Sequence, residues 1–226
     1  MNESPQTDTS SVAKTFPFRA AGMNERRAAV HLLSRFSFGP REDEIERALS
    51  MGLEAWFDEQ LAAKRPEPKL DVWRPRFRAL ALSGAQIAQR YPRPTALLAE
   101  ARRAGVIPEN SERDPEQALA RREQRDAVGE FARQKGYRSQ RELAQELLAW
   151  KVLRATLAEN QLAEVATDFW FDHFTVSSVD PETRAYLLAY ERDAIRPHVF
   201  GRFRDLLGAV ARHPAMLLYL DNARST

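Results

Sequence analysis

Apolar residues at helical spacing, in one segment after another, are the feature that most constrains the fold of this chain. After Ser139, which can cap a helix, leucine and valine recur every three or four residues up to Leu157. The same spacing covers residues 161–174, 181–196, 198–212 and 215–222. No segment alternates apolar and polar residues as a half-buried strand does. The sequence therefore predicts an all-α fold, a bundle-like array of helices without significant sheet.

Prolines, glycines and changes in composition divide the chain into four predicted segments. Residues 1–22 are polar and without periodicity, which indicates a flexible leader. In residues 23–63, three short helical patterns are separated by Gly39–Pro40 and by Gly52, which predicts a small helical cluster. Residues 64–138 combine many prolines with a charge-dense stretch, so we expect a loop-rich and charged helical connector. We expect residues 139–226 to form the main helical core, truncated at its C-terminus.

The composition narrows the classes of function. The 226 residues include no cysteine, which excludes disulfides, thiolate ligands and a cysteine nucleophile. Lys and Arg outnumber Asp and Glu by only 34 to 32, so we expect no nucleic-acid partner. Arg121, Arg122 and Arg125 offer an alternative nucleic-acid face, but no aromatic residues are interleaved with them, and we interpret residues 114–135 as a solvated helix.

The N-terminus lacks the apolar run that is typical of a secretory signal. No stretch approaches the roughly 20 apolar residues of a membrane span. We therefore expect a cytoplasmic chain without a transmembrane segment. Its oligomeric state is left open by the sequence.

Ionisable residues among large apolar ones are concentrated between Glu164 and Asp221. Glu164, Asp168 and Asp172 recur every four residues, which places three carboxylates on one stripe of a helix, where like charges repel. Such acids need solvent, arginine partners or a bound cation. Nearby arginines could pair with these acids and so favour an ion-pair network between adjacent helices. These arginines are Arg184, Arg192, Arg196, Arg202 and Arg204.

A second carboxylate is predicted to lie in an apolar face. Leu188, Glu191 and Ile195 share one helical stripe, and burial raises the pKa of a carboxyl group unless a cation pairs with it. Together with two histidines, these acids suggest the donor set of carboxylate-bridged iron or manganese sites in helical bundles. The candidate ligands for a divalent metal are Glu164, Asp168, His173, Glu191 and His198.

The metal hypothesis competes with a structural one. Neither a Glu-x-x-His pair nor an HExxH motif occurs in the sequence. Convergence of His173, Glu191 and His198 in a cleft would favour a metal site, whereas pairing of the acids with arginine would favour a network that joins helices. We interpret His31 as a packing or capping residue, and we expect His213 to interact with the C-terminal end of the helix before it.

Three blocks of sequence, residues 28–61, 161–176 and 190–225, resemble the bacterial family catalogued as domain of unknown function 1800. The resemblance implies an uncharacterised helical protein without an established activity. Members of this family are longer, many are exported, and beyond the motif at Asp221 and Asn222 they continue into a segment rich in Asn, Glu, Arg and His. We therefore expect this chain to be the amino-terminal portion of such a protein.

The family motifs begin with His31, Arg35 and the sequence that ends at Pro40. Polar residues in the later motifs are the candidate catalytic residues that the resemblance implies: His173, Glu191, Arg192, Asp193, Arg196, His198, Asp221 and Asn222. The leading hypothesis is a polar or metal-assisted site in the full-length form, with its cofactor unknown.

The alternative is a non-catalytic helical interaction or structural module. In that case Trp170, Phe171 and Phe174 pack against a protein partner or the missing C-terminal half. We also expect an apolar patch at Leu217, Leu218 and Leu220.

Overall fold

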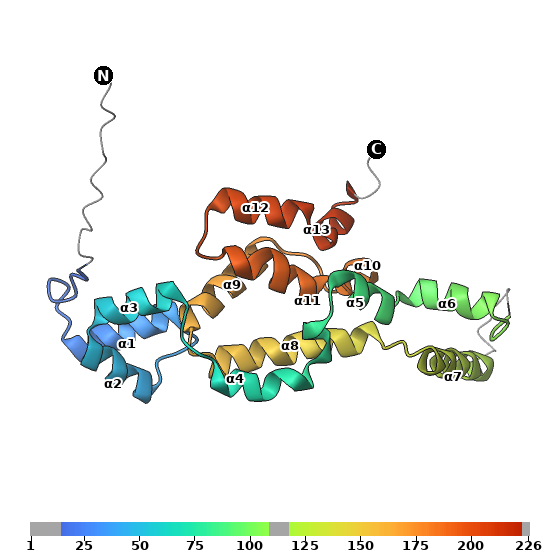
Figure 1. The fold of residues 1–226 in the computed structure, drawn as a ribbon, viewed down its shortest axis with the longest axis horizontal. Helices are drawn as coiled ribbons and strands as arrows, with labels where there is room; N and C mark the ends of the chain where they lie inside the picture. Colours follow the sequence, from blue (N-terminus) through green and yellow to red (C-terminus); the bar gives the residue numbers. More distant parts are fainter. Residues whose placement is uncertain (1–14, 109–117, 223–226) are drawn as a thin grey trace, which may run out of the picture. The chain divides into compact units, whose positions relative to one another are not determined.

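The computed structural model describes residues 15–108 and 118–222 (Figure 1). Every regular element in this part of the chain is a helix, which confirms the all-α prediction. The chain divides into two compact units, Met1–Arg65 (unit 1) and Pro66–Thr226 (unit 2). None of the helices within the described ranges has both the length and the apolar character needed to cross a membrane.

Unit 1 contains three helices: α1 (Glu25–Phe36), α2 (Glu42–Met51) and α3 (Leu53–Ala62). Asn24 caps α1, because its side chain accepts a hydrogen bond of 2.9 Å from the backbone N–H of Arg27. Gly52 separates α2 from α3 at φ +90°, a backbone conformation that favours glycine. Leu33 and Trp56 are almost fully buried where the three helices meet. Caps and breaks that are visible in the sequence therefore position these helices.

Residues 15–22, which the sequence places in the flexible leader, pack against unit 1; we call them the strap. The backbone N–H of Phe16 donates to Glu54 Oε1 at 2.9 Å. The ring of Phe16 contacts Phe57 edge-on, with 5.6 Å between ring centroids, and Phe18 packs against the same core. Two phenylalanines in a polar stretch are thus enough to attach it. Residues 1–14 of the predicted leader lie outside the described residues.

Unit 2 contains the remaining elements. These are α4 (Pro68–Trp73), η1 (Arg74–Arg76), η2 (Arg78–Ala81), α5 (Gly84–Arg90), α6 (Pro94–Arg103), α7 (Ala118–Gln134), α8 (Gln140–Leu157), α9 (Gln161–His173), α10 (Pro181–Arg184), α11 (Leu187–Ala189), η3 (Tyr190–Ile195), η4 (Arg196–His198), α12 (Phe203–Arg212) and α13 (Pro214–Tyr219). Ser139 caps α8, as predicted, by accepting from the backbone N–H of Glu142 at 3.1 Å. The segment η3 is a π-helical turn, a form that is frequent at functional sites.

Side chains from both halves of unit 2 share its core. Ile87 and Tyr91 of the proline-rich region pack with Leu143 of α8 and Leu188 of α11. Leu70 of α4 packs with Trp150 in the same way. Residues 66–91 therefore help to build the core that surrounds α8.

The charge-dense helix α7 has a small apolar face. Val128 and Phe131 are buried against Ala101 of α6. Its opposite face is solvated and carries the exposed pair Glu130–Arg133, in which Arg133 Nη2 lies 2.6 Å from Glu130 Oε2.

The C-terminal apolar patch is formed in part. Leu220 is 65% exposed, whereas Leu217 and Leu218 are half-buried. The packing of α10 and α12 against the short helix α13 accounts for this partial burial.

The turn between α8 and α9 is held by a side chain from the start of unit 2. The carboxylate of Glu67 accepts from the backbone N–H of Glu159 at 2.7 Å and from that of Asn160 at 3.2 Å. It also accepts from Nδ2 of Asn160 at 2.6 Å. Asn160 is the N-cap residue of α9, so Glu67 places a negative charge where the helix dipole favours one.

His213 lies between two helices: its backbone N–H donates to the carbonyl oxygen of Val210 at the end of α12, and its side chain caps α13, the helix after it. Its Nδ1 accepts from the backbone N–H of Ala215 at 3.2 Å, and Pro214 occupies the first turn. Burial lowers the pKa of His213; the charge of Asp193 opposes this effect and that of Arg192 adds to it. An accepting Nδ1 must be unprotonated, so cap and charge state are coupled.

We predict that this cap weakens in mild acid. The pKa of His213 is lower in the folded than in the unfolded chain, so stability is complete above the unfolded value of about 6.5 and falls as the pH decreases below it. Asparagine can cap the helix without titrating. His213→Asn should therefore flatten the loss of stability between about pH 7 and pH 5. Urea unfolding at each pH measures this, and equal slopes for the two proteins would contradict it.

Candidate functional site

Buried and half-buried charges join α8, α9 and the segment η3–η4 in unit 2. Six residues form this charged cluster: Lys151, Arg154, Glu164, Asp168, Glu191 and Arg196. Helix α9 packs against both α8 and η3, which brings the three elements close enough for their side chains to meet. The acids come from α9 and η3, whereas the cations come from α8 and η4.

Glu164 is held by two arginines. Its side chain is 4% exposed, and Arg154 binds both carboxylate oxygens, with 2.8 Å from Nε to Oε2. Arg196 Nη1 donates to Glu164 Oε1 at 2.8 Å. Burial raises the pKa of the Glu164 carboxyl, but the hydrogen bond from Arg154 and the charge of Arg196 outweigh burial and leave the pKa below its usual value. Glu164 is therefore ionised and paired at neutral pH.

Arg196 also binds Glu191, so one guanidinium bridges two carboxylates. Its Nη2 donates to Glu191 Oε1 at 2.8 Å. The sequence predicts Glu191 in an apolar stripe with Leu188 and Ile195, and all three are buried. The second oxygen, Oε2, is buried and has no hydrogen-bond partner among the described residues. Lys151 Nζ lies 3.9 Å from it, close enough for charge attraction but too far for a hydrogen bond.

Lys151 connects Glu191 with the last acid of the cluster. Its Nζ lies 2.7 Å from Asp168 Oδ1 and 4.1 Å from the ring centroid of Phe171. The third acid of the predicted stripe, Asp172, is exposed and forms no part of the cluster. The stripe is therefore divided between a paired, inward part and a solvated end.

The proposed metal ligands are brought together only in part. Glu164, Asp168 and Glu191 approach one another, but Lys151, Arg154 and Arg196 lie between them. His173 is exposed and packs against Trp170 and Phe174, with centroid separations of 5.4 and 4.9 Å. His198 is half-buried on η4. Within the described residues, no three His, Asp or Glu side chains are grouped so that they could hold a metal ion.

The other residues from the family motifs have separate positions. Arg192 Nε and Nη2 bind Asp193, each at 2.6 Å, and its Nη1 donates to the carbonyl oxygens of Leu80 and Leu82 at 2.9 and 2.8 Å. Arg192 thus ties the π-helical turn to η2. Asp221 and Asn222 are exposed at the end of the described residues.

Lys151 and Arg154 are not among the cation partners that the sequence predicts. Of the five arginines predicted as partners for the acidic stripe, only Arg196 pairs with one of its acids within the described residues. Arg184, for example, donates to the carbonyl oxygens of Ser178 and Val179. The sequence does contain a sign of this pairing: Arg154 lies five residues before Glu159, and Glu164 lies five residues after it. When the chain turns back at Glu159, these two side chains lie opposite each other on the two helices.

A pocket of about 210 Å³ opens beside the charged cluster. Four arginines line it, namely Arg74, Arg154, Arg192 and Arg196, together with Glu191. Arg74 is exposed at η1, and the other three belong to α8, η3 and η4. The charged side chains of the lining are therefore predominantly cationic.

The chain matches a known protein family. A model of the family described as "Protein of unknown function (DUF1800)" matches residues 31–226. No curated protein and no solved structure matches the chain. The family model covers both the charged cluster and the arginine-lined pocket.

We predict that Glu164→Gln is strongly destabilising. The change leaves Arg154 and Arg196 without their shared buried anion, which costs about 3–5 kcal/mol in comparable buried pairs. Because the folded pKa of Glu164 lies below its usual value of about 4.5, its contribution is complete above that pH and is lost as the pH falls through the folded pKa. The variant should therefore lose part of the acid dependence of stability.

The matched control is Asp172→Asn on the exposed end of the same stripe. This change should alter the free energy of unfolding by less than about 0.5 kcal/mol. Denaturant unfolding at several pH values compares the two variants. Equal stabilities would show that the pairing of Glu164 contributes little.

Proposed function

The chain belongs to the DUF1800 family, whose description names no activity, and from the geometry of unit 2 we propose that it binds a small anion in the arginine-lined pocket. The anion is a carboxylate or a phosphate group on a small molecule. The observation that supports this is the lining itself, in which four guanidinium groups accompany one carboxylate. Guanidinium groups bind both kinds of oxyanion through paired N–H donors.

Donors for such a ligand are available. The contacts of Arg154 use Nε and Nη2, and those of Arg196 use its two Nη atoms. Each guanidinium has five N–H donors, so both retain donor capacity that no described residue uses. Arg74 has one contact of 3.3 Å with Asp71, and both of these side chains are largely exposed.

The shape and wall of the pocket restrict the ligand. Leu80, Leu147, Trp150 and Leu188 supply apolar wall, which suits a ligand with a short apolar part. The volume of about 210 Å³ is below the usual range of about 300–1,000 Å³, so the bound group is small.

This proposal keeps part of the candidate catalytic set. Glu191, Arg192 and Arg196 belong to the proposed site, whereas His173, His198, Asp221 and Asn222 do not line the pocket. Binding is the proposed function, and the acids serve to hold the arginines in place. The rival account is a structural network with the same contacts and no ligand.

We predict that inorganic phosphate and acetate stabilise the full chain beyond the effect of chloride at equal ionic strength. A ligand that binds only the folded state raises stability by RT ln(1 + [L]/Kd). Arg74→Gln should weaken the apparent affinity for both anions about fivefold, because an exposed ion pair contributes up to about 1 kcal/mol of binding free energy. Thermal unfolding and titration calorimetry measure both effects.

Arg78→Gln is the matched control, because Arg78 is also exposed, lies four residues away and does not line the pocket. It should bind both anions like the unchanged protein. If neither anion stabilises the protein, or if the two variants lose affinity equally, the charged cluster is a structural network only.

A further inference from the structure

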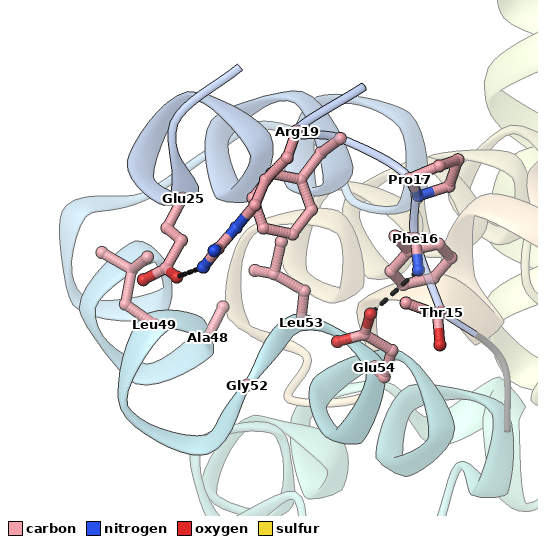
Figure 2. A pocket seen from close by; sticks show the side chains of 11 residues that line it. Thr15, Phe16, Pro17, Arg19, Glu25, Ala48, Leu49, Gly52, Leu53 and Glu54 are labelled. Carbon is pink, nitrogen blue, oxygen red and sulfur yellow. Dashed lines mark hydrogen bonds and ion pairs between the residues drawn. The ribbon is translucent and has the colours of Figure 1, made fainter. Parts of the chain in front are cut away.

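Two pockets adjoin the strap in unit 1, and they differ in charge. The larger, of about 540 Å³, contains Glu25, Glu54 and Arg19 in its lining. Figure 2 shows that these groups are engaged: Arg19 Nη2 lies 2.6 Å from Glu25 Oε1, and Glu54 accepts from the backbone of Phe16. This pocket therefore presents mainly satisfied polar groups.

The second pocket, which we call the α1 pocket, has a volume of about 310 Å³ and a largely apolar wall. Phe18 and Met23, within and next to the strap, line it together with Leu32 and Phe36 of α1. Leu53 of α3 contributes to both pockets. The volume lies at the lower end of the range for small-molecule sites, about 300–1,000 Å³.

Two basic residues are the polar side chains of the α1 pocket. His31 and Arg35 are one helical turn apart on α1, so they lie on the same face of the helix. The sequence predicts a packing or capping role for His31, but its side chain is exposed, because it lies on the outer edge of the apolar stripe.

Neither of these two side chains forms a hydrogen bond or an ion pair with another described residue. Arg26 and Arg47 of unit 1, in contrast, have acidic partners: Arg26 pairs with Glu42 and Glu46, and Arg47 pairs with Glu59. Arg35 is charged at any physiological pH. The α1 pocket thus combines apolar wall with an uncompensated positive charge.

We propose that the α1 pocket binds an amphipathic anion, a carboxylate with an alkyl chain. The chain lies against Phe18, Leu32 and Phe36, and the carboxylate lies at Arg35 and His31. Burial of alkyl carbons supplies most of the affinity, since each CH₂ removed from water contributes about 0.8 kcal/mol. The guanidinium of Arg35 selects the sign of the head group, and the imidazole of His31 beside it can donate a hydrogen bond.

Calorimetric titration of the full chain with octanoate tests the proposal. Octylammonium has the same chain length and the opposite charge, and acetate has the head group without the chain. We expect octanoate to bind at least several-fold more tightly than octylammonium. Arg35→Gln should weaken octanoate binding about fivefold, as expected for an exposed ion pair.

Arg27→Gln is the matched control, because Arg27 is an exposed residue of α1 that does not line the pocket. It should leave octanoate binding unchanged. Equal effects of the two substitutions, equal binding of octanoate and octylammonium, or no binding of octanoate would each overturn the proposal.

Arg74→Gln separates this site from the arginine-lined pocket of unit 2. If octanoate affinity falls in Arg74→Gln and not in Arg35→Gln, the carboxylate binds in unit 2, and the α1 pocket is not its site. If Arg35→Gln alone weakens octanoate, the assignment to unit 1 stands whatever phosphate and acetate do in unit 2.

Discussion

The antiparallel register of α8 and α9 determines which charges meet in unit 2. Arg154 and Glu164 are equally distant from Glu159 along the chain, and Lys151 and Asp168 lie eight residues before and nine after it. Folding back at this turn therefore opposes two cations to two acids. Arg196 then joins Glu164 to Glu191. In a different register Glu164 would lose Arg154 and Asp168 would lose Lys151, and Arg154 would lose the acid that holds it beside the pocket.

Local patterns in the sequence predict most of the helices and the burial of Glu191, because caps, breaks and apolar spacing act within a few residues. Ser139 caps α8 as predicted, and Asn24 before α1 is a cap of the same kind. The cation partners of the acidic stripe depend instead on how one helix lies against the next, which composition and periodicity do not specify. The π-helical turn has the same apolar residues as an ordinary helix would, so it leaves no separate pattern. The strap was missed because its two phenylalanines stand in a polar stretch.

The two candidate binding sites use positive charge in different ways. In unit 2, Arg154 and Arg196 are oriented by buried acids, so their remaining donors have defined directions before any ligand arrives. Such preorganisation limits the entropy lost on binding. In unit 1, Arg35 is exposed on a helix surface next to apolar wall, so its side chain must be ordered by the ligand. The first arrangement favours selection by geometry, and the second favours selection by chain length and sign of charge.

The contact of Glu67 with the α8–α9 turn has a consequence for the order in which unit 2 forms. This side chain binds backbone groups 92 and 93 positions later in the chain. Contacts of such long range form slowly, because the loop must close before they contribute. During synthesis, Glu67 and α4 emerge well before the helices they bind, since domains are made from the N-terminus onward. Leu70 consequently has no core to enter until Trp150 has been made, so α4 cannot complete its packing before α8 and the turn after it have been translated.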